Sequence, residues 1–367
     1  MGKKYRVGVI GRTGGGGYGH DLDVAWLSVP EVEVVAVADE DPEGRAEAAN
    51  RLGVTATYSD YREMFESEKL DIVSICERWI DRHCEITLAA MERGLHMFME
   101  KPFCVDLEEA DKIVQTSERT GSKLGIGHPT RYSPKLQTLK NLMDEGKIGR
   151  VLEYRARGKE DHRGGAEDMR VLGTHMMDLI QFLGGLPQWC FAEITQDGRP
   201  ITKGDVIEGN EGLGPLAGDG VSAVYGMADG SRAYFDSQRD VPAEPYRYGL
   251  KIYGTDGVLE ILEGAMPSVK YLADPSWSPG RSGNQWQDVS SAGIGEPEPV
   301  SQPEHRARYY RGIQDLIDAI ENNRAPLDDA VAARNGLEMI LAPFESARLG
   351  CKVTLPLENR RHPLDLL

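Results

Sequence analysis

The first third of the chain alternates short apolar runs with longer amphipathic segments. Apolar runs predict strands at residues 5–11, 33–39, 70–76 and 123–127, and a strand followed by a turn at residues 95–103. Segments between them have helical periodicity and predict helices at residues 20–30, 41–53, 81–94 and 106–121. This rhythm is typical of a parallel sheet wrapped by right-handed crossovers. We therefore expect an α/β domain over residues 1–127.

The pattern changes after about residue 128. Residues 222–238 and 248–262 each read as two strands joined by an Asp-Gly turn, which indicates antiparallel pairing. A further strand is predicted at 151–158, and helices are predicted at 134–146, 171–185, 306–323 and 327–350. Two Gly/Pro-rich segments, 205–220 and 274–305, are long for loops of a compact domain. Loops of this length are usually functional or mobile. We expect a second domain of the α+β class over residues 128–367.

The length and the net charge of the chain limit the number of domains and the kinds of partner to expect. A chain of 367 residues exceeds what one hydrophobic core usually organises, so two domains fit its size. Its net charge of −17 repels nucleic acid and anionic lipid. The five cysteines are scattered without a C-x-x-C spacing, so we expect reduced thiols and no metal site. No stretch approaches the ~18 apolar residues of a membrane span, and the N-terminal residues show no leader pattern, so we expect a cytoplasmic protein.

A run of glycines follows the first predicted strand, within residues 11–19. A strand, a glycine-rich turn and a helix start allow backbone N–H groups and the helix dipole to hold a pyrophosphate. The simple G-x-G-x-x-G pattern fits poorly from Gly11, because its middle position is Thr13. With one residue inserted after Gly11, Gly14 and Gly17 take the phosphate-binding positions, and we prefer this register. The alternative is a flexible surface loop.

Asp39 strengthens the dinucleotide hypothesis because it ends the next predicted strand. A carboxylate at this place accepts hydrogen bonds from the adenosine ribose and repels a 2′-phosphate. Glu40 and Asp41 follow it without a basic residue nearby, so NAD is favoured over NADP. Arg12 is the exception, since its guanidinium could reach a 2′-phosphate instead of pairing with Asp39.

Lys101 stands between Glu100 and Pro102 at the end of another predicted strand. Proline restricts the preceding residue to extended geometry, and open α/β sheets bind ligands beyond the carboxyl ends of their strands. A ligand-facing lysine is therefore one interpretation, and a surface lysine paired with Glu100 is the other.

The motifs along the chain also resemble a known family. They include the glycine turn with His20, "VAVADEDPEGRAEAANRLG", "DIVSIC", "HCEITLAAMERGLHMFMEKPF", "RYSP", "GRVLE", "LGTHMMDL", "LKIYGTDGVLEI" and "FESARLGCKVTLPL". In order and spacing they resemble the Gfo/Idh/MocA oxidoreductases over nearly the whole chain. The resemblance implies an N-terminal Rossmann domain, a C-terminal α+β domain with a large, mostly antiparallel sheet, and a bound nicotinamide cofactor. It further implies hydride transfer at one carbon of a sugar, cyclitol or related polyol, and a homodimer or homotetramer.

The resemblance also implies roles for single residues. Lys101 matches the family lysine that contacts the reacting oxygen, and His175 matches the histidine that moves the proton. Such a pair lowers the barrier because hydride leaves an alcohol carbon only as the O–H proton is removed. A buried structural histidine is the alternative for His175. The expected cofactor-binding residues are Gly11, Arg12, Thr13, Gly14, Gly17, Tyr18, Asp39, Cys76, Trp79, His83, Glu100 and Lys101.

The sequence departs from the family pattern in two places. Members often carry an aspartate four residues before the histidine, where this chain has Val171. Asp168, seven residues before His175, would share its face if the helix extends that far, and we take it as a catalytic candidate with Glu167 as second choice. Both acids could instead simply begin the helix. The second departure is a longer turn after residue 76, where Trp79 could pack on the cofactor or the substrate, or under the helix.

Planar, multi-donor side chains are the remaining candidates for binding a hydroxyl-rich substrate. They are His128, Arg131, Tyr132, His162 and Arg163, with Trp277 or Trp286 as surfaces on which a sugar could stack. Two other functions use the same features. One is glycoside cleavage through transient oxidation and elimination, and the other is a non-catalytic, dinucleotide-bound regulator.

Overall fold

The computed structural model describes residues 4–300 and 308–367, which fall into two compact units. Unit 1 comprises Met1–Tyr132, Asn210–Gly214 and Pro303–Arg334, and unit 2 comprises Ser133–Gly209, Pro215–Gln302 and Asn335–Leu367. The chain first passes from unit 1 to unit 2 after Tyr132, and the single division expected after residue 127 stays a prediction. Two later segments also join unit 1: α10 (Tyr310–Glu321) packs on β5 (His96–Met99) and β6 (Leu124–Ile126), and residues 210–212 pack against residues 80–82.

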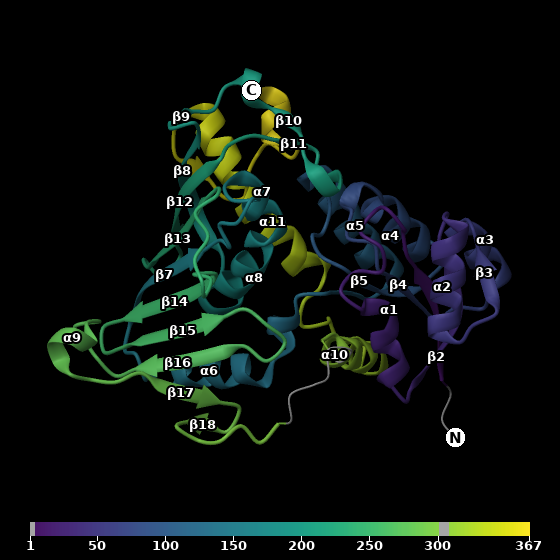
Figure 1. The fold of residues 1–367 in the computed structure, drawn as a ribbon, viewed down its shortest axis with the longest axis horizontal. Helices are drawn as coiled ribbons and strands as arrows, with labels where there is room; N and C mark the ends of the chain where they lie inside the picture. The colour runs from purple at the N-terminus through teal and green to yellow at the C-terminus, as the bar shows by residue number, and fades with distance from the viewer. Residues whose placement is uncertain (1–3, 301–307) are drawn as a thin grey trace. The chain divides into compact units, whose positions relative to one another are not determined.

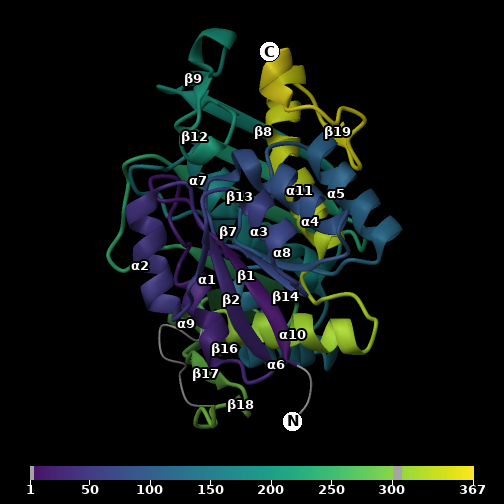
Figure 2. The same ribbon diagram turned by 90° about the vertical axis from the view of Figure 1, so that its right-hand side faces the viewer.

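Among the described residues, unit 1 contains a six-stranded parallel sheet in the order β3-β2-β1-β4-β5-β6. Its strands are β1 (Tyr5–Ile10), β2 (Val32–Ala38), β3 (Ala56–Tyr58), β4 (Ile72–Ile75), β5 (His96–Met99) and β6 (Leu124–Ile126). The five strands expected from apolar runs are present, whereas β3 is too short to give a pattern. β1 and β2 run side by side (Figure 2). The order reverses between β1 and β4, and such sheets bind ligands beyond the carboxyl ends of the strands at this point.

Local sequence signals set the ends of the helices in unit 1. The side chain of Asp41 caps α2 (Pro42–Leu52) by accepting the N–H of Gly44 at 2.7 Å, and Gly53 ends the helix in the left-handed region. Asp106 and Gly121 do the same for α5. The other helical segments described in this unit are α1 (Leu22–Ala25), η1 (Trp26–Ser28), α3 (Tyr61–Ser67), η2 (Ile80–Arg82), α4 (His83–Met91), α5 (Leu107–Thr120), η3 (Pro129–Tyr132) and η5 (Asn210–Gly212) (Figure 1).

The helix predicted over residues 20–30 is shorter than expected. α1 has four residues and continues as the 3-10 turn η1. Asp21 has a φ of 65°, so regular helix cannot extend back through it to the glycine run. Trp26 then fixes the turn, since its Nε1–H donates to Oγ of the buried Ser74 at 2.7 Å.

Aromatic side chains from distant segments form the core of unit 1 around Phe98 on β5. The ring centroid of Phe98 lies 6.5 Å from that of Trp26 and 6.1 Å from those of Tyr132 and Tyr309. All four side chains are buried. Tyr309 directly precedes α10, so this cluster explains why a segment late in the sequence belongs to the first unit. Of the helix predicted at 306–323, residues 306 and 307 lie outside the described residues.

Within its described residues, unit 2 contains an 11-stranded sheet in the order β18-β17-β16-β15-β14-β7-β13-β12-β8-β19, with β9 paired to β8. Its strands are β7 (Val151–Arg157), β8 (Pro187–Gln196), β9 (Arg199–Pro200), β12 (Gly220–Met227), β13 (Arg232–Gln238), β14 (Gly249–Gly254), β15 (Val258–Leu262), β16 (Ser268–Leu272), β17 (Gln287–Ser290), β18 (Gly293–Ile294) and β19 (Val353–Thr354). Both Asp-Gly turns join antiparallel neighbours as predicted, and β14, β15 and β16 lie side by side in Figure 1. β7 and β13 pair in parallel. The expected α+β class with a large, mostly antiparallel sheet is confirmed.

Helices cover one face of this sheet. α8 packs on β7 and β14, and α7 packs on β12 and β13. The other segments are the separate hairpin β10 (Ile207–Glu208) with β11 (Pro215–Leu216), and α6 (Pro134–Asp144), α7 (Ala166–Val171), α8 (Gly173–Gly184), η4 (Lys203–Asp205), α9 (Pro279–Ser282), η7 (Pro363–Leu366) and most of α11 (Ala330–Leu349). Of the long predicted loop 274–305, residues 301–305 lie outside the described part. None of the described helices combines the length and apolar character that crossing a bilayer requires.

Phe98→Ala should destabilise unit 1 by about 3–5 kcal/mol, because it leaves a cavity among four packed aromatic rings. Chemical denaturation followed by tryptophan fluorescence measures the change. Leu27→Ala is the control, since Leu27 is 49% exposed in the same unit. Equal effects of the two substitutions would show that Phe98 does not hold the core together.

Candidate functional site

The glycine run folds as a closed loop after β1. The N–H of Arg12 donates to the carbonyl of Gly17 at 3.0 Å, and the N–H of Gly17 donates back to the carbonyl of Arg12 at 2.9 Å. Gly14 and Gly17 have left-handed φ values of 80° and 61°, and a Cβ at either would meet no described atom within 4 Å. These two glycines are the pair that the preferred register assigns to phosphate binding. They face space that a ligand can occupy.

Other glycines of the run are required by close packing. A Cβ at Gly16 would lie 2.6 Å from the backbone nitrogen of Arg78, and one at Gly19 would lie 2.7 Å from Cγ of Glu100. Both distances are shorter than any real carbon contact, so a larger residue would push the loop away from its neighbours. The run therefore needs glycine for two reasons: Gly14 and Gly17 have left-handed backbone over open space, and Gly16 and Gly19 pack too closely on their neighbours to carry a Cβ.

Asp39 lies at the end of β2 and holds the glycine loop. Its Oδ2 accepts the backbone N–H of Thr13 at 3.0 Å and the hydroxyl of Thr13 at 2.8 Å, and its Oδ1 accepts the N–H of Asp41 at 3.0 Å. Gly44 makes room for this contact, since a Cβ there would lie 1.8 Å from Oγ1 of Thr13. Tyr18 is also close, and burial together with the Asp39 carboxylate raises the pKa of the Tyr18 hydroxyl. Three of the predicted cofactor residues are thus in one cluster.

Arg12 pairs with Asp81 at 2.7 Å, and its guanidinium lies 5.3 Å from the ring centroid of Trp79. The sequence left open whether Arg12 pairs with Asp39. In the structure it joins the glycine loop to the turn after β4, and Trp79 is the surface on which it lies.

A cavity of about 190 Å³ opens beside Asp39. The strand ends contribute Gly11, Asp39 and Glu40 to its lining, and other segments contribute Tyr61, Arg62 and Arg82. The cavity and its carboxylates fit the adenosine of NAD, and the open faces of Gly14 and Gly17 leave room for its pyrophosphate. The two arginines are absent from the sequence hypothesis. Only the position of Arg82 directly before the predicted cofactor residue His83 could have suggested it.

Glu100 is a fully buried carboxylate beside the glycine loop. Its Oε1 lies 2.7 Å from Nδ1 of His20 and accepts the hydroxyl of Tyr309 at 2.6 Å, and its Oε2 accepts the N–H of Lys101 at 2.8 Å. Burial alone would raise its pKa. The hydrogen bonds from His20 and Tyr309 and the charge of Lys101 outweigh burial and lower the pKa of Glu100 to about 2. Glu100 is therefore an anion that three segments of unit 1 stabilise.

Lys101 is 4% exposed and lies two residues after the end of β5, close to the strand end as the sequence predicted. Its neighbours are fixed by His83, whose Nδ1 lies 2.9 Å from the carbonyl of Pro102 and whose Nε2 lies 2.9 Å from the carbonyl of Glu77. His83 thus connects the lysine turn to the turn after β4. Cys76 is fully buried at the end of β4, and burial raises the pKa of its thiol, which keeps it neutral.

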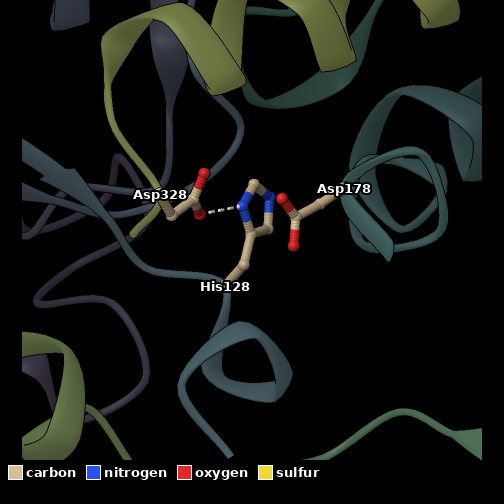
Figure 3. Close-up of side chains that lie close together, drawn as sticks. All are labelled: His128, Asp178 and Asp328. Atoms are coloured by element: carbon tan, nitrogen blue, oxygen red, sulfur yellow. Dashed lines mark hydrogen bonds and ion pairs between the residues drawn. The ribbon is translucent and has the colours of Figure 1, made fainter. Parts of the chain in front are cut away.

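Three predicted substrate residues of unit 1 have contacts within the unit. Nδ1 of His128 lies 2.7 Å from Oδ2 of the buried Asp328, toward which its ring points (Figure 3). Nη2 of Arg131 donates to the carbonyl of Leu327 at 2.9 Å. Tyr132 is a core residue whose hydroxyl donates to a backbone carbonyl of β6 at 2.9 Å. These contacts favour a supporting role for Tyr132 and leave the roles of His128 and Arg131 as predictions.

In unit 2, His175 lies near the start of α8 and is 2% exposed. Its Nδ1 lies 3.4 Å from Oε1 of Glu263, and its ring meets that of Tyr248 edge to face, with the centroids 6.5 Å apart. The hydroxyl of Tyr248 donates to the carbonyl of Leu172 at 2.9 Å, directly before the helix. Glu263 was not predicted, because it follows β15, almost ninety residues after the histidine.

Asp168 does not share a continuous helix with His175. α7 ends at Val171 and α8 begins at Gly173, so the geometry that would align the two side chains is interrupted. Oδ2 of Asp168 instead accepts the hydroxyl of Ser237 at 2.6 Å and the N–H of Glu160 at 3.0 Å. Burial raises the pKa of Asp168. Asp168 and Glu167 both lie in the first turn of α7, which agrees with the alternative that the two acids simply begin the helix.

The remaining polar candidates lie in the loop before α7. His162 is 81% exposed, with Nδ1 3.9 Å from Oδ1 of Asp161. Arg163 pairs with the same aspartate at 3.0 Å. His162 is thus accessible to a ligand, whereas Arg163 contributes to the loop.

The two tryptophans proposed for sugar stacking lie against the sheet of unit 2. Trp277 donates its Nε1–H to the carbonyl of Gly254 at 2.8 Å and packs on Tyr253, with ring centroids 4.9 Å apart. Lys251 lies 5.9 Å from the ring centroid of Trp286. These contacts favour an anchoring role for both side chains.

Two protein-family models, one for each domain, match successive parts of the chain. The oxidoreductase family with an NAD-binding Rossmann fold matches residues 5–128, and the GFO/IDH/MocA C-terminal domain matches residues 136–260. The chain belongs to the GFO/IDH/MocA oxidoreductase family. Membership confirms the resemblance drawn from the motifs, the NAD-binding Rossmann domain and the oxidoreductase class.

Relatives and solved structures agree with this assignment. The scyllo-inositol 2-dehydrogenase (NAD(+)) of Bacillus subtilis is 26% identical, over 98% of this chain and 98% of its own length. The levoglucosan dehydrogenase of Pseudarthrobacter phenanthrenivorans is 25% identical, over 68% of this chain and 72% of its own. A solved levoglucosan dehydrogenase with NADH and levoglucosan has a TM-score of 0.76 at 21% identity, covering 96% of this chain and 100% of that one. At this identity the solved structure supports the GFO/IDH/MocA fold, while the roles of single residues stay predictions.

Tyr309→Phe should destabilise the protein by about 1.5–3 kcal/mol near neutral pH, because it removes a hydrogen bond to a buried anion. Since folding lowers the pKa of Glu100 from 4.5 to about 2, the contribution is complete above pH 4.5 and is lost as the pH falls toward 2. Urea denaturation across this pH range measures it. Tyr310→Phe is the matched control, since the Tyr310 hydroxyl meets an exposed Gln314. A pH-independent difference between the two variants would contradict the assignment.

Proposed function

We propose that the protein transfers a hydride between NAD and a secondary hydroxyl, or the matching ketone, of a sugar, cyclitol or sugar derivative. Lys101 carries the proposal, as a buried cation two residues after β5 whose backbone N–H donates to the side chain of Glu100. A cation there can stabilise the alkoxide that develops as an alcohol carbon gives up hydride. The relatives are named for inositol and levoglucosan, both polyols, which supports the substrate class.

His175 is our candidate for the proton transfer. Oxidation of an alcohol removes a proton from its oxygen as hydride leaves its carbon, and an imidazole is suited to accept that proton near neutral pH. We assign Glu263, whose Oε1 lies 3.4 Å from Nδ1 of His175, to stabilising the imidazolium once the proton has arrived. The contacts of Asp168 support a different role for it, as an anchor between α7 and β13.

The cofactor would be held mainly by backbone groups and by Asp39. Gly14 and Gly17 offer the open face of the loop, and the hydrogen bonds from Thr13 fix the carboxylate of Asp39, which lines the cavity. NAD, when bound, accepts the hydride or returns it. Asp39 and Glu40 line the cavity together, and two carboxylates there disfavour a 2′-phosphate, which supports NAD over NADP.

Replacing the two residues assigned to the chemistry should abolish most of the turnover. Lys101→Ala and His175→Gln should each lower kcat by about 10²–10⁴-fold, the usual contribution of a positioned acid, base or charge. Nicotinamide absorbance measures turnover with scyllo-inositol, levoglucosan and a panel of sugars, and NADH fluorescence measures cofactor binding separately.

Lys112→Ala is the control for this series, because Lys112 is an exposed lysine on α5 of the same unit. Unchanged kcat in the Lys101 or His175 variant would contradict the assigned role. Absence of NADH and NADPH binding by the native protein would overturn the proposal as a whole. Glycoside turnover with no net change in nicotinamide absorbance would replace it with oxidation followed by elimination.

We further propose that the protein forms a homodimer or homotetramer through the face of the unit 2 sheet opposite α7 and α8. Neighbouring strands place Phe191, Val224, Tyr234 and Arg155 in one row on this face. Phe191 is 46% exposed, which is unusual for a phenylalanine in a strand. A cavity of about 790 Å³ lies on the same face and is lined by Arg155, Tyr234 and Lys251. An apolar row bordered by charges suits contact with a second copy of the chain.

Phe191→Glu should shift the protein toward monomer, because it introduces four repelling or desolvated charges per tetramer, or two per dimer, into an apolar contact. Analytical ultracentrifugation gives the mass. Leu27→Glu adds the same charge at an exposed residue of unit 1 and should leave the mass unchanged. A native protein that sediments as a monomer would disprove the association.

The scattered cysteines support a cytoplasmic location. All five cysteines are free thiols, and four of them are buried. An oxidising compartment would favour paired cysteines instead. We therefore propose that the protein works in the cytoplasm.

A further inference from the structure

The guanidinium of Arg82 lies in the wall of the cavity beside Asp39, and carboxylates hold each of its edges. Nε donates to Oε1 of Glu77 at 3.2 Å, and Nη2 donates to Oε2 of Glu77 at 2.6 Å. Nη1 pairs with Glu40 on the opposite side. The plane of the group is therefore fixed, because rotation would break the fork-to-fork contact with Glu77.

Glu77 is a rigid support for this arginine. It is fully buried, and its carbonyl oxygen lies 2.9 Å from Nε2 of His83. A buried carboxylate requires a charged partner, so Arg82 cannot leave it at low energetic cost. The side chain of Arg82 nevertheless keeps 20% exposure, so part of the group stays accessible in the cavity wall.

The charge of the cavity is negative although two arginines line it. Arg82 is shared between Glu77 and Glu40, and Arg62 is shared between Asp60 and Glu85. Asp39, Glu40 and Asp60 also line the cavity. Acids therefore neutralise both guanidinium groups, so the cavity opposes an additional phosphate. Arg62 lies over the ring of Tyr61, with its Cζ 4.5 Å from the ring centroid, which leaves Arg82 as the planar surface for an uncharged ring.

We propose that Arg82 is the surface on which the adenine ring of the cofactor stacks, and that the Glu40–Arg82 pair excludes NADP. The proposal rests on the proposed function, since it assumes that this cavity takes the adenosine half of NAD. Planar bases stack on guanidinium groups, and a fixed guanidinium loses little freedom on binding. Glu40 acts twice, because it repels a 2′-phosphate and occupies the Nη1 group that could otherwise bind one.

Arg82→Lys tests the stacking surface. Lysine keeps a cation beside Glu77 but has no planar face. We expect the Kd for NADH to rise about tenfold, in the range that stacking on one base contributes. The Kd for reduced nicotinamide mononucleotide, which lacks the adenosine half, should stay unchanged. Fluorescence titration measures both without turnover.

Glu40→Gln tests the exclusion of NADP. Removal of the charge, with release of Nη1, should lower the ratio of the Kd for NADPH to the Kd for NADH about tenfold or more. Glu47→Gln is the matched control, because it makes the same charge change at an exposed position of α2. Its ratio should equal that of the native protein.

The outcomes separate the inference from the proposed function. Native protein that binds neither NADH nor NADPH disproves the proposed function. Native protein that binds NADH, with an Arg82→Lys variant that binds it equally tightly, disproves the stacking surface. An unchanged ratio in Glu40→Gln disproves the exclusion. If thermal unfolding shows that Arg82→Lys does not fold, Arg82→Met combined with Glu77→Gln removes both charges and gives the same comparison.

Discussion

The buried carboxylate of Glu100 is the constraint on which the cofactor-binding unit depends. A buried charge is costly unless hydrogen bonds and opposite charges surround it. Glu100 obtains them from His20 at the end of the glycine run, from Tyr309 before α10 and from the backbone of Lys101. These residues lie far apart in the sequence, so the need to satisfy one anion brings three segments together. The position of Lys101 follows from it.

A second acid completes the restraint on the glycine run. Asp39 holds Thr13 near the start of the run, while Glu100 holds His20 at its end. A loop anchored at both ends can keep glycines in its middle without losing its shape, which explains how Gly14 and Gly17 retain left-handed backbone over open space. The same anchoring reduces the ordering that a ligand would otherwise have to impose.

Features that local sequence patterns encode could be predicted, and features that distant contacts create could not. Apolar periodicity gave the parallel sheet, and proline after Lys101 gave the position of that lysine at a strand end. The short α1 was missed because the left-handed backbone of Asp21 leaves no mark in the hydrophobic pattern. Glu263 and Arg82 were missed because only folding brings Glu263 beside His175 and brings Arg82 into the wall of the cavity beside Asp39. The carboxylate expected near His175 illustrates this, since Asp168 lies elsewhere and Glu263, directly after β15, is the acid whose Oε1 lies 3.4 Å from Nδ1 of His175.

The acidic excess of the chain bears on how an anionic cofactor could be held. The net charge is −17, and arginines near the glycine loop are matched by acids, with Arg12 on Asp81, Arg51 on Asp23 and Arg82 on Glu77. α1 has four residues, so its dipole is short. A pyrophosphate would then depend on those backbone N–H groups of the loop that the internal hydrogen bonds of Arg12, Thr13, Gly15, Gly17 and Gly19 do not already use. Glycine allows ligands the closest approach to such groups, and a run of glycines is therefore the arrangement that an acidic protein with a short first helix requires.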